Sequence, residues 1–239
     1  MKNYIITLCC LFVITSQCVA QRDPGPVWIP AKQTYELFVS PNKTDRDIEK
    51  ITNVNGDNVN GSPYLDDEWQ KGVIILKDNR KYENYKLKYN IFTQIVSFFA
   101  DNTSLDISDG IKEFSIFFDA NKTRRFVNAN NYKRQNQLLY LEVLLDAKKG
   151  MLLKSQTKAI VANSDIANKS RFKQFEDTYQ YYYYNKSKEE LSKIKKTGSN
   201  LESILSLTPE QIKNLVMPRF DFSAEESLVS FFTLYEAQQ

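Results

Sequence analysis

The middle of the chain, from Gly72 to about Lys196, alternates short apolar runs with polar turn residues. The runs are rich in β-branched and aromatic residues, as in "VIIL", "NIFTQIVSFF", "IKEFSIFF" and "LLYLEVLL". Such runs, with turn signals about every ten residues, are typical of strands joined by hairpins. The pattern predicts an antiparallel meander of roughly nine or ten strands, folded as a curved sheet or a partly closed barrel.

The residues after Lys196 follow a different period, because apolar positions recur about every 3.6 residues, as they do in amphipathic helices. Three serine or threonine residues are each followed by glutamate or glutamine at the spacing of a capping box, which marks a helix start. They are Ser199 with Glu202, Thr208 with Gln211, and Ser223 with Glu226. We therefore expect three short helices between residues 199 and 237, in an α+β fold that is mostly β.

The first 20 residues have the features of an export signal. Lys2 precedes an uncharged run, and Cys18, Val19 and Ala20 fit a signal-peptidase site before Gln21. The run is shorter than the roughly 20 apolar residues that span a bilayer, so no transmembrane segment is expected once the signal is removed. The sequence thus predicts an exported protein of the periplasm or the extracellular space.

The predicted domain organisation has three parts. Residues 1–20 are the signal peptide, residues 21–71 are an extended arm followed by a long polar loop, and residues 72–239 are a single β-rich domain. The arm is rich in proline and the loop in asparagine and glycine, which disfavour regular structure. The helices expected at 199–237 belong to the last domain, because three short helices are too small to fold alone.

The composition limits the chemistry of the exported chain. The sequence has no histidine, and its cysteines, Cys9, Cys10 and Cys18, all lie in the predicted signal peptide. The processed protein would then have no disulfide, no thiol nucleophile, no Ser-His-Asp triad and none of the usual nitrogen or sulfur ligands of zinc, copper or haem. We predict no metal, no cofactor and no catalytic residue. The net charge of +3 comes from interspersed acids and bases, which argues against a nucleic-acid partner.

Three neighbouring acids, Asp66, Asp67 and Glu68, lie between Tyr64 and Trp69. Glycoside hydrolysis needs two carboxylates held apart across a substrate, whereas successive residues of an extended chain point to opposite faces. We therefore interpret the acids as hydrogen-bonding groups of a turn. Tyr64 and Trp69 either anchor this turn on the sheet or belong to a ligand or partner surface.

Two further pairs of residues are candidates for such a surface. Arg124 and Arg125 lie in a basic stretch with interleaved aromatic residues, which is consistent with a solvated hairpin or with a site for an anion or a lipid headgroup. Tyr181 and Tyr183 would share one face of a strand, because side chains alternate between the two faces. Exposed tyrosines bind sugars and proteins, but the ordinary role of tyrosine in strands is cross-strand packing, which is the interpretation we favour.

Two stretches of the chain resemble a family of uncharacterised exported proteins of Gram-negative bacteria. They are "NGSPYLDDEWQKGVIILKDNRKYENYKLKYNIFTQIVSF", with its GSPYL turn, tryptophan and LKYNIFT strand, and the C-terminal "NLESILSLTPEQIKNLVMPRFDFSAEESLVSFFTLYEA". The first stretch departs from the family at "DNRK", where a glycine is usual in the hairpin turn. The resemblance implies an exported protein that is mostly β with helices at the end, and it transfers no catalytic residue.

These observations predict a non-enzymatic binding or structural protein of the cell envelope, whose partner is an envelope protein or a small apolar ligand. Two alternatives stay open. A carrier of a lipid or other hydrophobic molecule in a half-open barrel would require an apolar cavity. A carboxylate-dependent glycan hydrolase would require two carboxylates about 5 to 10 Å apart in one cleft.

Overall fold

The computed structural model describes residues 39–41, 59–100, 103–107, 110–119, 122–132, 140–165, 170–195, 197–216 and 220–238. Residues 1–30 form one unit and residues 31–239 form another, and every described residue belongs to the second unit. The predicted signal peptide at 1–20 and much of the predicted arm and loop at 21–71 lie outside the described residues. The predicted division into three parts therefore stays a prediction.

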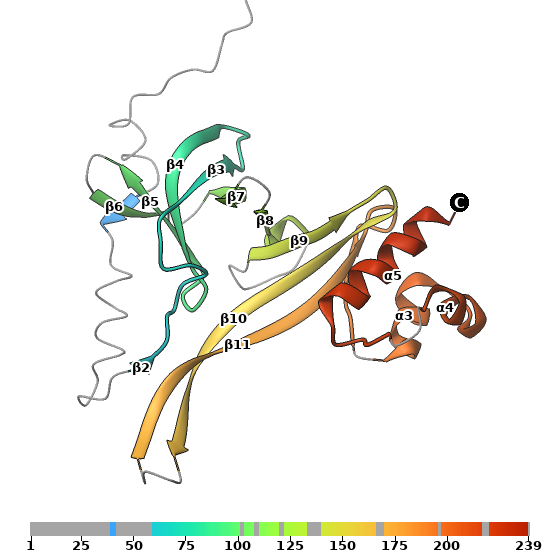
Figure 1. Cartoon of the computed structure of the whole chain (residues 1–239). Coiled ribbons are helices and arrows are strands. Elements are labelled where there is room, and N and C mark those ends of the chain that lie inside the picture. The colour runs from blue at the N-terminus through green and yellow to red at the C-terminus, as the bar shows by residue number, and fades with distance from the viewer. Residues whose placement is uncertain are drawn as a thin grey trace, which may run out of the picture. The chain divides into compact units, whose positions relative to one another are not determined.

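Twelve described strands pair into one large sheet (Figure 1). The first six along the chain are β1 (Val39–Pro41), β2 (Val59–Asn60), β3 (Gln70–Leu76), β4 (Lys81–Asn90), β5 (Ile95–Ala100) and β6 (Thr103–Ile107). The others are β7 (Ile111–Asp119), β8 (Lys122–Asn128), β9 (Tyr140–Asp146), β10 (Gly150–Asp165), β11 (Ser170–Asn185) and β12 (Glu190–Lys193), with the short 3-10 helix η2 (Ala129–Tyr132) after β8. The ten strands from β3 to β12 lie where nine or ten were expected, so the predicted number is confirmed.

The order of strands across the sheet is β1-β6-β5-β4-β3-β7-β8-β9-β10-β11-β12, and β2 adds a short parallel pair to β11. Strands that follow one another from β3 onward are neighbours in the sheet except at one step, because β7 pairs with β3 and not with β6. Among the described strands, β1 and β12 end the order and do not pair with each other. The predicted meander is therefore confirmed as an open, curved sheet (Figure 1).

The hairpin turn between β3 and β4 contains Asn79, in the stretch "DNRK". Asn79 adopts a positive φ of 66°, the left-handed conformation that asparagine tolerates better than most residues. Its amide donates to the carbonyl of Leu76 at 2.9 Å, and its side-chain oxygen accepts from Lys112 Nζ at 2.8 Å. These bonds hold the turn in the absence of a glycine.

One face of the sheet, which we call the inner face, carries a core of aromatic rings. Tyr89 on β4, Phe114 on β7, Phe126 on β8 and Tyr140 on β9 are buried, and the centroids of contacting rings lie 4.8 to 5.9 Å apart. Ring pairs of this kind add about 0.5 to 1.5 kcal/mol each beyond the burial of apolar area. Aliphatic side chains of β3 to β7 surround the rings, and together they form the aromatic core.

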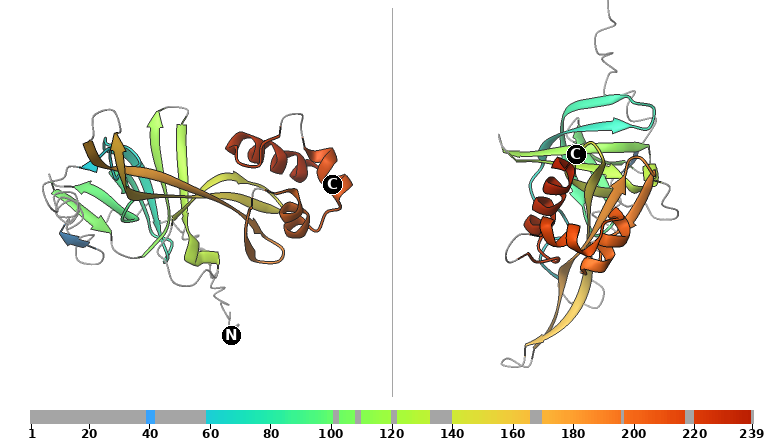
Figure 2. Two further views of the ribbon diagram at one scale, coloured as in Figure 1. Left: turned by 90° about the horizontal axis from the view of Figure 1, so that it is seen from below. Right: turned by 90° about the vertical axis from the view of Figure 1, so that its right-hand side faces the viewer.

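Three helices cover the inner face near β9 to β12 (Figure 2). They are α3 (Gly198–Leu205), α4 (Pro209–Leu215) and α5 (Glu225–Ala237). With Leu152 of β10 and Tyr183 of β11 they form a second core, the helix core, in which Phe231 and Phe232 of α5 are fully buried. The predicted α+β, mostly β, fold with three short C-terminal helices is thus confirmed.

Helix capping follows the sequence at one of the three predicted boxes. The hydroxyl of Thr208 accepts from the amide of Gln211, and the side chain of Gln211 accepts from the amide of Thr208, so this capping box is confirmed. The boxes predicted at Ser199 and Ser223 are wrong, because α3 and α5 begin without a side-chain cap. Ser223 donates its hydroxyl to Asp221 at 2.7 Å instead, which withdraws it from the helix start.

Candidate functional site

Charged residues lie between the two cores on the inner face. Glu142 on β9 lies opposite Phe126 of the aromatic core and, on its other side, opposite Lys154 on β10. Lys154 in turn lies opposite Tyr181 on β11, and Leu152, two residues before it, belongs to the helix core. The polar positions therefore separate the aromatic core from the helix core.

Four side chains in this region form a continuous ion network, defined as Arg124, Glu142, Lys154 and Glu225. Arg124 donates from Nε and Nη2 to the two carboxylate oxygens of Glu142, both at 2.6 Å. Lys154 Nζ lies 2.9 Å from Glu142 Oε2 and 2.7 Å from Glu225 Oε2. Glu142 and Lys154 are only 7% and 8% exposed. The first residue of α5, Glu225, thus pairs with a buried cation of the sheet.

The electrostatics of the ion network favour a fixed carboxylate over a proton donor. Burial raises the pKa of Glu142, but the hydrogen bonds and charges of Arg124 and Lys154 outweigh burial and hold that pKa below its ordinary value. The general acid of a glycoside hydrolase needs a carboxyl group whose pKa is raised. Glu142 therefore has the properties of a structural anion that holds two cations in place.

The ion network brings two of the predicted surface residues together. Arg124 is one of its members, and Tyr181 donates its hydroxyl to Glu225 Oε2 at 3.4 Å. Burial raises the pKa of Tyr181 to about 12, and the charge of Glu225 adds to this effect, so the hydroxyl keeps its proton. Arg124 Nη2 also donates to Gln156 Oε1 at 3.0 Å. Both residues take part in docking α5 on the sheet.

Arg125 and Tyr183, the other candidates from the same stretches, lie elsewhere. Arg125 points to the opposite face of the sheet, the outer face, where it pairs with Glu113 at 2.7 Å and Asp146 at 3.0 Å. Tyr183 is 1% exposed, and its ring stacks on that of Phe232 with centroids 4.8 Å apart. Tyr183 therefore packs in the helix core and is not part of the surface that the described residues present.

The acids of "YLDDEW" form a turn in the structure. Asp66 Oδ1 accepts from the amide of Glu68 at 2.8 Å, and Ser62 donates its hydroxyl to Asp67. Asp67 and Glu68 are exposed to solvent. The interpretation of these acids as hydrogen-bonding groups of a turn agrees with these contacts.

Tyr64 and Trp69 lie together beside this turn, at the margin of a larger surface on the outer face. Lys88 Nζ lies 4.2 Å from the ring centroid of Tyr64 and 5.9 Å from that of Trp69. The ring of Trp69 lies 5.6 Å from that of Phe99 on β5. An ammonium over aromatic faces is attracted by their negative potential, so these contacts hold Lys88 against the two rings.

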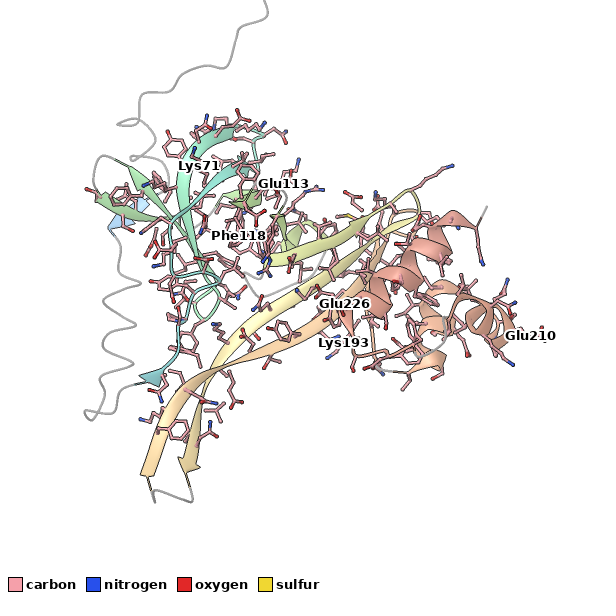
Figure 3. All side chains as sticks on the ribbon, viewed as in Figure 1. Lys71, Glu113, Phe118, Lys193, Glu210 and Glu226 are labelled. Atoms are coloured by element: carbon pink, nitrogen blue, oxygen red, sulfur yellow. The ribbon has the colours of Figure 1, made fainter. Side chains whose placement is uncertain are left out.

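The strand register extends this surface across four strands. Phe117 on β7, Lys71 on β3, Lys86 on β4 and Phe99 on β5 lie opposite one another in that order. Phe117 and Phe99 are 38% and 36% exposed, and the two lysines between them are exposed as well; Figure 3 labels Lys71. We define the lysine-aromatic face as Trp69, Lys71, Lys86, Lys88, Phe99 and Phe117.

The lysine-aromatic face contains three lysines, Lys71, Lys86 and Lys88. None of its three lysines makes an ion pair or a hydrogen bond with another residue in the described part of the chain. The neighbouring charges on β4 cancel, because Lys81 pairs with Glu83. Glu113, labelled in Figure 3, is already paired with Arg125. An anionic partner could therefore bind these three lysines without displacing a described carboxylate from them.

Sequence reasoning found Tyr64 and Trp69 but missed the rest of this surface. A signal was present in β4, where Lys86 and Lys88 alternate with the buried Leu87 and Tyr89 and so must share the outer face. The alternation does not say which strands lie beside β4. The strands beside β4 are β3 and β5, and Phe117 joins this surface through the pairing of β3 with β7, which are separated by three strands in the chain.

Comparison with known proteins adds no relative to this picture, because no protein-family model, no curated protein and no solved structure matches the chain. Within the described ranges, none of the helices has the length and apolar composition needed to cross a bilayer. In the same part of the chain, no group of three or more acidic, histidine or cysteine side chains is placed to hold a metal ion.

Proposed function

We propose that the protein is an exported, non-enzymatic binding protein of the cell envelope that engages its partner through the lysine-aromatic face. The observation that carries this proposal is that three lysines, which form no ion pair with any described residue, lie next to exposed rings on one sheet face. Exposed rings provide apolar contact area, and lysines provide charge and hydrogen-bond donors for an anionic partner. The export signal predicted at residues 1–20 supports a partner in the envelope.

The ion network supports a role in binding over a role in catalysis. Its two carboxylates, Glu142 and Glu225, share the ammonium group of Lys154, and Arg124 donates to both oxygens of Glu142. Despite burial, Arg124 and Lys154 hold the pKa of Glu142 below its ordinary value, so this carboxyl group is not set up to hold a proton near neutral pH. The hydrolase alternative would need such a group.

The carrier alternative has less support than binding at the sheet surface. A carrier needs an apolar cavity on the inner face. The inner face of β4, β7, β8 and β9 is occupied by the contacting rings of the aromatic core, and the inner face near β9 to β12 is occupied by helices. The exposed aromatic residues of the lysine-aromatic face offer apolar contacts without requiring such a cavity.

Photo-crosslinking in intact cells tests this proposal. The photoreactive amino acid p-benzoylphenylalanine would replace Phe99 on the lysine-aromatic face and, as a matched control, Leu234 on α5, which is 41% exposed. The full chain would be expressed in its own host, irradiated and analysed by mass spectrometry. We expect an adduct with an envelope component from position 99 and none from position 234. Equal adducts at both positions, or none at position 99, would contradict the proposal.

A further inference from the structure

We infer that the lysine-aromatic face docks on an anionic lipid surface, with its lysines at the phosphate-bearing headgroups and its rings at the boundary with the acyl chains. This inference rests on the proposed function, because it names the class of partner for the same face. It assigns the contact to Lys71, Lys86 and Lys88 together with the rings beside them.

The geometry of the row fits a surface better than a pocket. Phe117, Lys71, Lys86 and Phe99 occupy consecutive strands, so the two lysines lie side by side with one phenylalanine at each end. Strands are about 4.8 Å apart, so the row spans about 14 Å. Lysine stems extend past the rings, which lets ammonium groups reach phosphates while the rings contact apolar groups. A row of this kind matches an extended interface with several headgroups.

The third lysine adds charge next to amphipathic rings. Lys88 lies over Tyr64 and beside Trp69, and both of these rings combine an apolar body with a polar edge. Tyrosine and tryptophan are enriched at the headgroup level of membranes for that reason. The pairing of lysine with these rings therefore places charge and interfacial aromatic groups at the same margin of the face.

The residue types distinguish a lipid surface from a protein partner. Lysine is depleted at protein interfaces, where it must lose strongly held water, but it is favoured next to anionic membranes. Arginine, which proteins prefer for paired contacts, is absent from the face; Arg125, the nearest outer-face arginine in the described strands, is held by Glu113 and Asp146. The three lysines of this face, which have no carboxylate partner among the described residues, are therefore suited to a surface that carries several separate negative charges.

The experiment measures binding of the full chain to vesicles of phosphatidylcholine with and without phosphatidylglycerol. The test variant is Lys71→Gln/Lys86→Gln/Lys88→Gln, and the control variant is Lys193→Gln/Lys195→Gln/Lys213→Gln, which removes the same charge from exposed lysines of β12, the segment after it and α4. Each lysine near an anionic surface contributes about fivefold in affinity, so the test variant should lose about 100-fold. The control variant should keep most of the affinity, and added salt should weaken binding of the natural chain.

A second readout tests the rings without removing a charge. Trp69 can be observed alone in a Trp28→Phe variant, because the chain has two tryptophans. Its fluorescence should shift to shorter wavelength with vesicles that contain phosphatidylglycerol and stay unchanged with phosphatidylcholine alone. An unchanged spectrum during binding would overturn the assignment of the rings to the lipid boundary.

The failures of the two proposals can be told apart. Equal affinity for both vesicle types, an equal loss in both triple variants, or no vesicle binding together with a protein or glycan adduct at position 99 would overturn the lipid inference and leave the proposed function standing. Absence of any envelope adduct at position 99 and of any vesicle binding would overturn both.

Discussion

The two cores of the inner face are closed in different ways. The aromatic core is closed by side chains of β3 to β9 packing on one another, whereas the helix core is closed by α3, α4 and α5. Curvature brings the inner faces of several strands together, so rings from four of them meet directly. Near β9 to β12 the same face is covered by helices. One end of the inner face is therefore buried by side chains of the sheet itself, and the other end is buried by the three helices.

The ion network lies between the aromatic core and the helix core. Buried charges are costly unless they are paired, and an apolar residue at the same place could join the two cores without that cost. The network instead links Glu142 of the sheet to Glu225 of α5 through one ammonium group. We therefore expect the helix layer to depend on the network and the aromatic core to be independent of it.

The largest effect is expected from a change in the aromatic core. Phe114→Ala removes a fully buried ring that contacts Tyr89, Phe126 and Tyr140, and should lower the free energy of unfolding by about 4 kcal/mol. Urea unfolding followed by circular dichroism measures the loss. Phe117→Ala, from the same strand but the outer face, should change stability by about 0.5 kcal/mol. Similar losses of stability in both variants would show that the packing of the buried rings does not stabilise this part of the sheet.

Much of this architecture could be predicted from the sequence, because the responsible signals are local. The change in the spacing of apolar residues after Lys196 predicted the helices. The alternation along the run of tyrosines predicted that Tyr181 and Tyr183 share one face of a strand. Tyr181 and Tyr183 do face the helix core, while Tyr182 and Tyr184 pack on the outer face. The capping box at Thr208 is made by residues three positions apart, so its signal is local.

The features that were missed depend on contacts between distant segments. The carboxylate of Glu225 and the ammonium of Lys154 are far apart in sequence, and neither residue stands out in its own stretch. In the lysine-aromatic face, Phe117 lies next to Lys71 through the pairing of β3 with β7, which skips three intervening strands. The cap at Ser223 failed for a local reason, because its hydroxyl bonds Asp221. The sequence pattern does not say whether this hydroxyl bonds Asp221 or the start of α5.

A smaller effect, confined to the helix layer, is expected from the ion network. Lys154→Met keeps the aliphatic stem but removes the charge between Glu142 and Glu225, and should cost about 2 kcal/mol because Arg124 still neutralises Glu142. Limited proteolysis should cut residues 197–238 faster while the strands stay protected. Lys158→Ala is the control, since Lys158 lies on the same strand and, among the described residues, its ammonium group bonds the carbonyl of Ser62 and no carboxylate. Equal protection of the helices in Lys154→Met and the natural chain would contradict their dependence on the network.

The smallest of these effects is expected from acid, because a protonated carboxyl group can still accept hydrogen bonds from Arg124. The folded-state pKa of Glu142 lies below the ordinary value of 4.5, so its carboxylate stabilises the fold above that pH. This contribution should be lost as the pH falls from about 4.5 through the folded-state pKa, as measured by urea midpoints between neutral and acidic pH.

A second carboxyl group also loses stabilising contacts in acid. Burial raises the pKa of Asp146 on the outer face, but Lys186 and Arg125 outweigh burial and lower that pKa, so protonation of Asp146 also destabilises the fold in acid. The contribution of Glu142 is therefore measured as the difference between the natural chain and Lys154→Met. The loss of stability in acid should be smaller in Lys154→Met, because this variant lacks one of the two cations that lower the pKa of Glu142. Identical acid profiles for the two proteins would show that Lys154 does not set the ionisation of Glu142.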